Sequence, residues 1–310
     1  MVEDNEIKAQ VSPFAIREGE IKTFDGKDGY VSMNQIVHKI NIGHITDIHF
    51  AILDLVNEFE FITSRQIYQM LEIKGIDPKS QDKLNNKLDA LVKSKILTRY
   101  YFTSDEGKGI YRIYCLEKMG KYLLTSKEVE CKWQPSDNTK PVPMIKKRLA
   151  GNQVLIAYLR KVKAFDGYVV KPAITAKTLG KVFKATGGSV KLSKNGKSIQ
   201  FLFEVFRREM DWQKKLVEKM NLYKDFYENF QPGDSGFTSL PQLIFVCEDE
   251  KHMAECFKEI VTNKVEIPQI KLLFTTDLRQ NKETLDDTLV EFKLVDGKYK
   301  MEDVELKLLG

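Results

Sequence analysis

The sequence predicts an α+β unit followed by an α/β unit. Its 310 residues exceed the usual length of one small domain, and 42% of them are hydrophobic, enough to fill two cores. In the first half, segments with apolar residues at helical spacing are followed by two β-rich runs. In the second half, short apolar runs alternate with segments of helical spacing. We therefore expect an arm (residues 1–43), a first domain (44–125), a linker (126–143) and a second domain (144–310).

The first domain begins with two predicted helices. One has a continuous apolar face, formed by Ile48, Ala51, Ile52, Leu55, Val56 and Phe59. The second starts at a capping box, in which Thr63 is followed three residues later by Gln66. Asp77 before Pro78 predicts the N-cap of a third helix, from Pro78 to about Lys93.

Two β-rich runs, ILTRYYFT and IYRIYCL, follow on either side of SDEGKG and predict a hairpin. Three helices and a hairpin in this order are typical of a winged helix. The segment YCLEKMGKYLL resembles the ending of many bacterial winged-helix regulators, with Tyr114, Leu116 and Gly120 at the Tyr-x-Leu-x-x-x-Gly positions. Lys95 stands where those regulators commonly have glycine.

The polar face of the third helix has the composition of a helix that enters the DNA major groove. Lysines there can neutralise phosphates, and amides can bond base edges. Arg99 and Lys108 on the hairpin are candidates for the minor groove or the backbone. The predicted DNA-binding residues are Lys79, Ser80, Gln81, Lys83, Asn85, Asn86, Lys87, Arg99 and Lys108.

Charge is unevenly distributed along the chain. Residues 126–224 hold 22 lysines and arginines against 8 acidic residues, a net charge of +14, whereas residues 225–310 hold 10 against 18, a net charge of −8. This division favours one face for a polyanion. The segment 126–143 contains three prolines and is predicted to be a linker.

The chain is expected to act in the cytoplasm, because it shows neither a signal peptide nor an apolar run long enough for a membrane span. Its four cysteines form no C-x-x-C pair, so we expect reduced thiols and neither a metal nor a cofactor.

In the second domain, residues 145–161 read as a helix, and SVKLSK and KSIQFLFEVF as two strands around an Asn195-Gly196 turn. An amphipathic helix is expected from Asp211 to Phe230, followed by a strand, a helix and a strand, an order that implies at least one right-handed crossover.

This domain resembles two kinds of enzyme site, but each lacks a residue that its chemistry requires. The GKS at residues 196–198 lacks the glycine of a phosphate-binding loop, because Lys191 occupies that position. The strand FLFEVF resembles the Glu-x-Lys strand of restriction-type nucleases, with Glu204 as the glutamate. Phe206 replaces the lysine, and the preceding strand has no carboxylate to complete a metal site.

Across residues 44–265 the layout resembles the replication-relaxation family of plasmids and other mobile elements. That resemblance implies a winged helix followed by a restriction-endonuclease-like α/β domain, with a glutamate on one strand and a lysine and a tyrosine on the next helix. Glu204, Lys219 and Tyr223 match these positions. Phe206 departs from the family's acidic residue two positions after the glutamate.

These observations favour a protein that binds double-stranded DNA without catalysis and serves plasmid replication or transfer. Replication or conjugation proteins and a second copy of the chain are further candidate partners. Three alternatives remain open: a winged-helix transcription repressor with a dimerisation or effector domain, a metal-dependent nuclease, and a scaffold whose winged helix binds protein.

Overall fold

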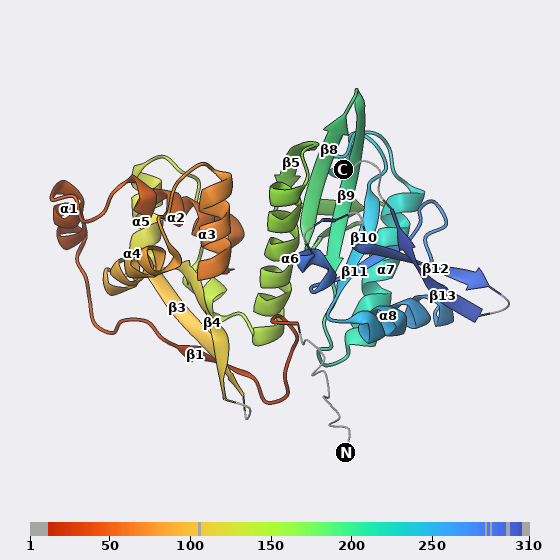
Figure 1. The fold of residues 1–310 in the computed structure, drawn as a ribbon, viewed down its shortest axis with the longest axis horizontal. Helices are drawn as coiled ribbons and strands as arrows, with labels where there is room; N and C mark the ends of the chain where they lie inside the picture. Colours follow the sequence, from red (N-terminus) through yellow and green to blue (C-terminus); the bar gives the residue numbers. More distant parts are fainter. Residues whose placement is uncertain (1–11, 105–106, 283, 286, 296–297, 306–310) are drawn as a thin grey trace, which may run out of the picture.

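The computed structural model describes residues 12–104, 107–282, 284–285, 287–295 and 298–305. Figure 1 shows two units, an N-terminal unit of helices with a narrow sheet and a second unit built on a wide sheet, with one long helix standing between them. None of the helices described is both long and apolar enough to span a bilayer.

The N-terminal unit contains the predicted helices and hairpin in the predicted order, with β1 and α1 before them and the short strand β2 between the first two predicted helices. These elements are β1 (Ile21–Phe24), α1 (Met33–Asn41), α2 (Asp47–Phe59), β2 (Ile62–Thr63), α3 (Ser64–Ile73), α4 (Gln81–Lys93), β3 (Leu97–Ser104), β4 (Gly107–Leu116) and α5 (Lys118–Ser126). The predicted capping box is present, since Thr63 accepts from the backbone of Gln66 while the Gln66 side chain accepts from the backbone of Thr63.

The sheet of this unit has the strand order β1-β3-β4-β2, and all its pairs are antiparallel. Strands β3 and β4 form the predicted hairpin. The arm contributes its outer strand, because Ile21 pairs with Thr103 and Phe24 with Tyr100.

Helix α4 starts three residues later than predicted. The Asp77 side chain accepts from the backbone of Lys79, so it closes a local turn there and does not cap the helix. Lys79 has a positive φ of 68°, which interrupts a helix from Pro78. Ser80 is the N-cap, and its hydroxyl accepts from the backbone of Lys83.

The second unit contains the predicted α/β elements and several that were not predicted. They are η1 (Pro135–Thr139), α6 (Val142–Lys161), β5 (Phe165–Val169), β6 (Ala173–Ala176), β7 (Lys181–Lys184), β8 (Gly188–Lys194), β9 (Lys197–Val205), α7 (Trp212–Glu228), η2 (Asp234–Gly236), β10 (Gln242–Cys247), α8 (Glu250–Thr262), β11 (Leu273–Thr276), η3 (Arg279–Asn281), β12 (Leu289–Val295) and β13 (Lys298–Val304).

Seven strands form the wide sheet, in the order β13-β12-β11-β10-β9-β8-β5. The predicted hairpin is present, with Asn195 and Gly196 both at positive φ between β8 and β9. The predicted crossovers are also present, since β10 runs parallel to both β9 and β11. The expected mixed fold class, α+β followed by α/β, is confirmed.

Helix α6 lies on one face of the wide sheet, and α7 and α8 lie on the other (Figure 1). On its opposite side α6 contacts α3 of the N-terminal unit. The apolar core on the α6 face is therefore continuous between the two units. The segment predicted as a linker holds η1 and the first residues of α6, and the Asn138 side chain in η1 donates to the carbonyl of Leu116.

The arm before β1 crosses from the wide sheet to the N-terminal unit. Ser12 donates to Asp277, which follows β11 and forms a bidentate ion pair with the buried Arg207 after β9. Glu20 lies 2.5 Å from the ammonium of Lys146 on α6. Buried polar contacts thus hold the arm against the second unit, and the pairing of β1 with β3 joins it to the N-terminal unit.

Gly120 shows why the sequence motif at the end of the hairpin contains a glycine. A Cβ at this position would lie 2.4 Å from the carbonyl oxygen of Ile96. At most helix positions, alanine stabilises the helix by about 1 kcal/mol relative to glycine. Here we expect Gly120→Ala to lower the free energy of unfolding by about 1–3 kcal/mol, because the backbone must shift. Urea unfolding monitored by circular dichroism measures the change.

Thr125→Ala is the matched control, because Thr125 lies exposed in the same helix. We expect this variant to be as stable as the wild type or slightly more stable. Equal stability of Gly120→Ala and wild type would contradict the close approach of α5 to Ile96.

Candidate nucleic-acid interface and the buried Glu204 cluster

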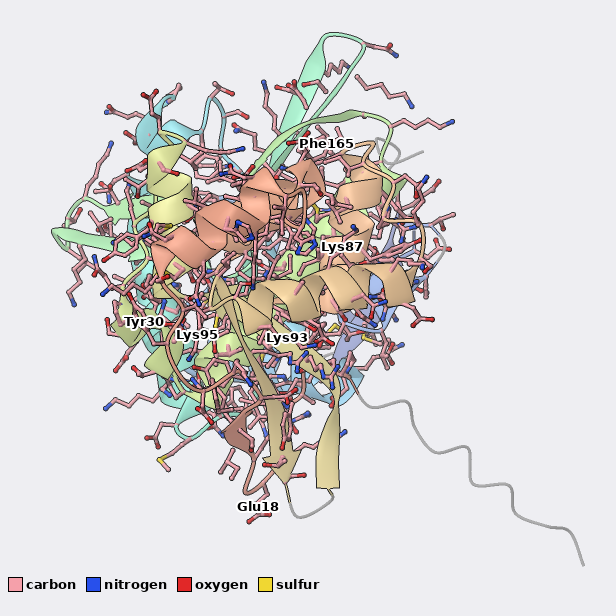
Figure 2. All side chains as sticks on the ribbon, turned by 90° about the vertical axis from the view of Figure 1, so that its left-hand side faces the viewer. Glu18, Tyr30, Lys87, Lys93, Lys95 and Phe165 are labelled. Carbon is pink, nitrogen blue, oxygen red and sulfur yellow. The ribbon has the colours of Figure 1, made fainter. Side chains whose placement is uncertain are left out.

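Helix α4 belongs to the N-terminal unit. Figure 2 looks onto the molecule from the side of this unit and labels Lys87 and Lys93 on the helix and Lys95 just beyond its end. Leu84, Leu88, Leu91 and Val92 face the core. The polar face is open to solvent, because Lys83, Asn86 and Lys93 are exposed and Lys87 is half-buried.

Several predicted DNA-binding residues on α4 have local partners. Lys79 is exposed and forms an ion pair of 2.8 Å with Asp77. The Gln81 side chain donates to Asn85 at 3.2 Å, and its own carbonyl oxygen is buried without a hydrogen-bond partner within the described residues. Ser80 serves as the helix cap. The Gln81 amide is therefore held against Asn85, with its carbonyl oxygen turned away from solvent.

The two predicted hairpin residues differ. Arg99 donates to Asp89 on α4 and lies 2.9 Å from Asp25, and only 12% of its side chain is exposed. Its guanidinium therefore ties β3 to α4 and to the arm. Lys108 pairs with Thr103 near the end of the hairpin, and its side chain lies outside the part that the structure describes.

Lys95 ends α4 in a left-handed conformation, with φ at 58°. Its backbone N–H donates to Val92, and that of Ile96 donates to Leu91, which together form a Schellman motif. This conformation favours glycine, so it explains why glycine is common at this position in winged-helix regulators. In this chain the position adds a cation beside the exposed face of α4.

The three residues matched to the family come together in the second unit. Glu204 on β9 is buried at 2% exposure. One of its carboxylate oxygens accepts from Tyr223 at 2.5 Å and lies 3.4 Å from the ammonium of Lys219. The other accepts from Thr186 at 2.7 Å. Lys219 and Tyr223 are one turn apart on α7, which places both over the same carboxylate.

The partners of Glu204 are all hydrogen-bond donors or cations. Burial, and then the charge of Glu204, raise the pKa of Tyr223 well above its usual value, so the phenol stays protonated and donates. Phe206 packs edge-on against Phe245 at 5.2 Å and is part of the core. Within the described residues, no group of three His, Cys, Asp or Glu side chains close enough to share a metal includes Glu204.

A cavity at the seam between the two units was not predicted from the sequence. It has a volume of about 280 Å³, and Thr186, which bonds Glu204, forms part of its wall. Its lining cations are Lys140, Lys147, Arg148, Lys171 and Lys184. The only sequence signal for them is the charge excess of residues 126–224, because they belong to separate segments that meet only on folding.

A second buried group, Cys247, His252 and Cys256, could hold a thiophilic metal ion. One donor atom from each residue lies within 4.8 Å of the others, and the two sulfurs are 4.0 Å apart. The set offers three ligands where zinc usually takes four. In addition, one imidazole nitrogen accepts from the backbone of Glu248 at 3.4 Å, and the ring packs edge-on with Trp212.

Two buried tyrosines on α7 allow a test of the Glu204 cluster. Tyr223 donates to a carboxylate, whereas Tyr227 donates to the carbonyl of Pro241 at 2.8 Å. We expect Tyr223→Phe to lower the free energy of unfolding by about 1.5–3 kcal/mol, because its bond is to a charged acceptor. Tyr227→Phe should cost about 0.5–1.5 kcal/mol. Urea titrations of both variants measure the difference, and an equal or smaller loss for Tyr223→Phe would contradict a charged Glu204 in this cluster.

Comparison with known proteins places this chain in a family. The restriction endonuclease FokI is similar over 75% of this chain and 43% of that chain, with 10% identity and a TM-score of 0.25, so this chain spans less than half of that protein. No curated protein matches the sequence. Residues 53–240 match the family model described as replication-relaxation. Because that match covers more than half of the sequence, the chain belongs to the replication-relaxation family.

Proposed function

We propose that this protein binds duplex DNA through α4 and the β3–β4 hairpin and serves the replication or transfer of a plasmid or other mobile element. Membership of the replication-relaxation family supports a role connected with replication. The single observation that carries the DNA-binding proposal is the exposed polar face of α4, with Lys83, Asn86 and Lys93, and we take the order of the surrounding elements to be that of a winged helix.

The arrangement suits a helix in the major groove. The apolar side of α4 is fully used by the core, so the polar side is free to meet a ligand. Lysine ammonium groups contact phosphates, whereas the amides of Gln81 and Asn86 are of the type that bonds adenine. In this proposal the hairpin beside the helix follows the DNA backbone.

The protein is proposed to act by binding and not by catalysis. A metal-dependent nuclease needs carboxylates that are free to hold a divalent cation. Glu204 instead has both oxygens occupied by Thr186, Tyr223 and Lys219. This network supports a structural role, in which Glu204 fixes α7 on the sheet.

The double substitution Lys83→Ala with Lys87→Ala tests the proposal. We expect weaker binding to every duplex sequence, since two phosphate contacts are lost. The slope of log affinity against log salt concentration should fall in magnitude by roughly two. Fluorescence anisotropy with labelled duplexes, measured at several salt concentrations, provides the readout.

Lys251→Ala with Lys258→Ala is the matched control, because both lysines are exposed on α8 in the acidic part of the chain. This pair should leave affinity and slope unchanged. Asn86→Ala should keep the slope but reduce the preference among sequences. An unchanged slope in the Lys83 and Lys87 variant would remove α4 from the interface.

Footprinting on the DNA around the gene separates replication from repression. Protection of direct repeats near a replication origin is the expected result. Two-fold protection of a palindromic promoter site would instead favour a transcription repressor, and loss of all DNA affinity at low salt would favour a protein-binding scaffold.

A further inference from the structure

We propose that the cavity at the seam between the two units is a binding site for a phosphate group, with Arg148 as its buried anchor. This inference goes beyond DNA binding by α4 and does not depend on it. The phosphate could belong to a free nucleotide or to a DNA strand, and both sources share the same recognition chemistry.

Arg148 is the central observation. Its side chain lies in α6 with 7% of the residue exposed, and the structure gives it one hydrogen bond, from Nη1 to the carbonyl of Val170 at 2.9 Å. A guanidinium has five N–H donors, and the others have no protein acceptor within the described residues. A buried cation without an ion pair is costly unless a ligand compensates it. Arg148 lines the cavity, so an anion there can accept from it.

The charge around the cavity is strongly unbalanced. Glu60, at the end of α2, is the only carboxylate among the residues that line it. Lys171 forms an ion pair with Glu60, and Lys140 lies 3.7 Å from the same carboxylate. Five cations and one carboxylate therefore line the cavity. Lys147 is also paired with Glu209 and Lys140 with Asp137, so Arg148 and Lys184 are the lining cations for which the described residues give no ion pair.

An adjoining cavity of about 300 Å³ continues this surface. It shares Glu60, Lys140, Lys171 and Lys184 with the first cavity and adds Trp133 to the lining. A phosphate at Arg148 would thus have space beside it for the rest of a nucleotide. The cavity also lies at the N-terminal end of α6, where the helix dipole favours an anion.

The pKa shifts of Lys171 and Arg148 agree with this geometry. Burial, and then the positive charge of Arg148, lower the pKa of Lys171 to about 8, although Glu60 opposes the shift. Burial also lowers the pKa of Arg148 to about 10, against the charges of Glu60 and Glu204. A bound dianion would favour the charged form of both groups.

Isothermal titration with inorganic phosphate, with a deoxynucleoside monophosphate and with a short 5′-phosphorylated duplex tests the site at constant ionic strength. Arg148→Met should weaken binding of the phosphate-bearing probe roughly tenfold to a hundredfold, as expected for loss of charge-assisted bonds. Arg160→Met is the matched control, because Arg160 is on the same helix and points to Glu72 at 3.8 Å. It should bind like the wild type.

Lys184→Ala keeps the test valid if Arg148→Met does not fold, because Lys184 is exposed and lines both cavities. It should weaken binding several-fold. Binding of the small probes identifies a nucleotide site. Binding of the duplex alone identifies a DNA phosphate, if the duplex still binds to the Lys83→Ala, Lys87→Ala variant. Absence of binding by all three probes, or binding unaffected by either cavity variant, would overturn the proposal.

Binding of the deoxynucleoside monophosphate, whose phosphate is already a dianion above pH 7, should also weaken as the pH rises through about 8, where Lys171 loses its proton. The groups facing Lys171 are Glu60 from the end of α2, Lys140 after η1 and Arg148 from α6. Lys171→Arg should retain its affinity from pH 7 to pH 9, because arginine stays charged there. Titrations of wild type and variant at the two pH values measure this difference, and an identical pH dependence would exclude Lys171 from the site.

Discussion

Helix α6 packs against two partners at once, the wide sheet and α3, and much of the structure follows from that constraint. Thirteen of its twenty residues are buried, because one side lies on the wide sheet and the other against α3. Polar side chains complete the contact where backbone groups are buried. Asn152 donates to the carbonyl of Phe61 at 2.7 Å, and Gln66 donates to the carbonyl of Leu149 at the same distance. These bonds fix how the two units meet.

The same constraint accounts for the position of the seam cavity. Gly151 lets α6 approach the strand connection so closely that a Cβ would lie 2.6 Å from the carbonyl oxygen of Thr186. Arg148, one turn earlier on the helix, is thereby held at the edge of the contact, where it is buried but lacks an ion pair. A site with this geometry depends on both units and would not exist in either one alone.

The polar surface of α4 has a different origin. Its core side and its caps are set by residues close in sequence, with Ser80 at the start and the left-handed Lys95 at the end. The Glu204 cluster is intermediate between the α4 surface, which depends on residues close in sequence, and the seam cavity, which depends on both units. Glu204, Lys219 and Tyr223 come from β9 and α7, which are consecutive along the chain, and Thr186 joins them from the connection between β7 and β8. The more elements have to pack together to form a site, the less of that site can be predicted from the sequence.

Local patterns in the sequence determined most of the elements of this protein. The Asn195-Gly196 turn, the Thr63–Gln66 capping box and the strand and helix alternation after Asp211 were all predicted correctly, because each depends on residues a few positions apart. The strands β6 and β7 were missed, since each has only four residues and neither shows a clear strand pattern. The predicted start of α4 was wrong, because Asp77, taken as the cap, closes a local turn at Lys79, and Ser80 caps the helix three residues later. The grouping of Arg148, Lys171 and Lys184 was decided only by tertiary structure, since no local pattern records which distant cations will share a cavity.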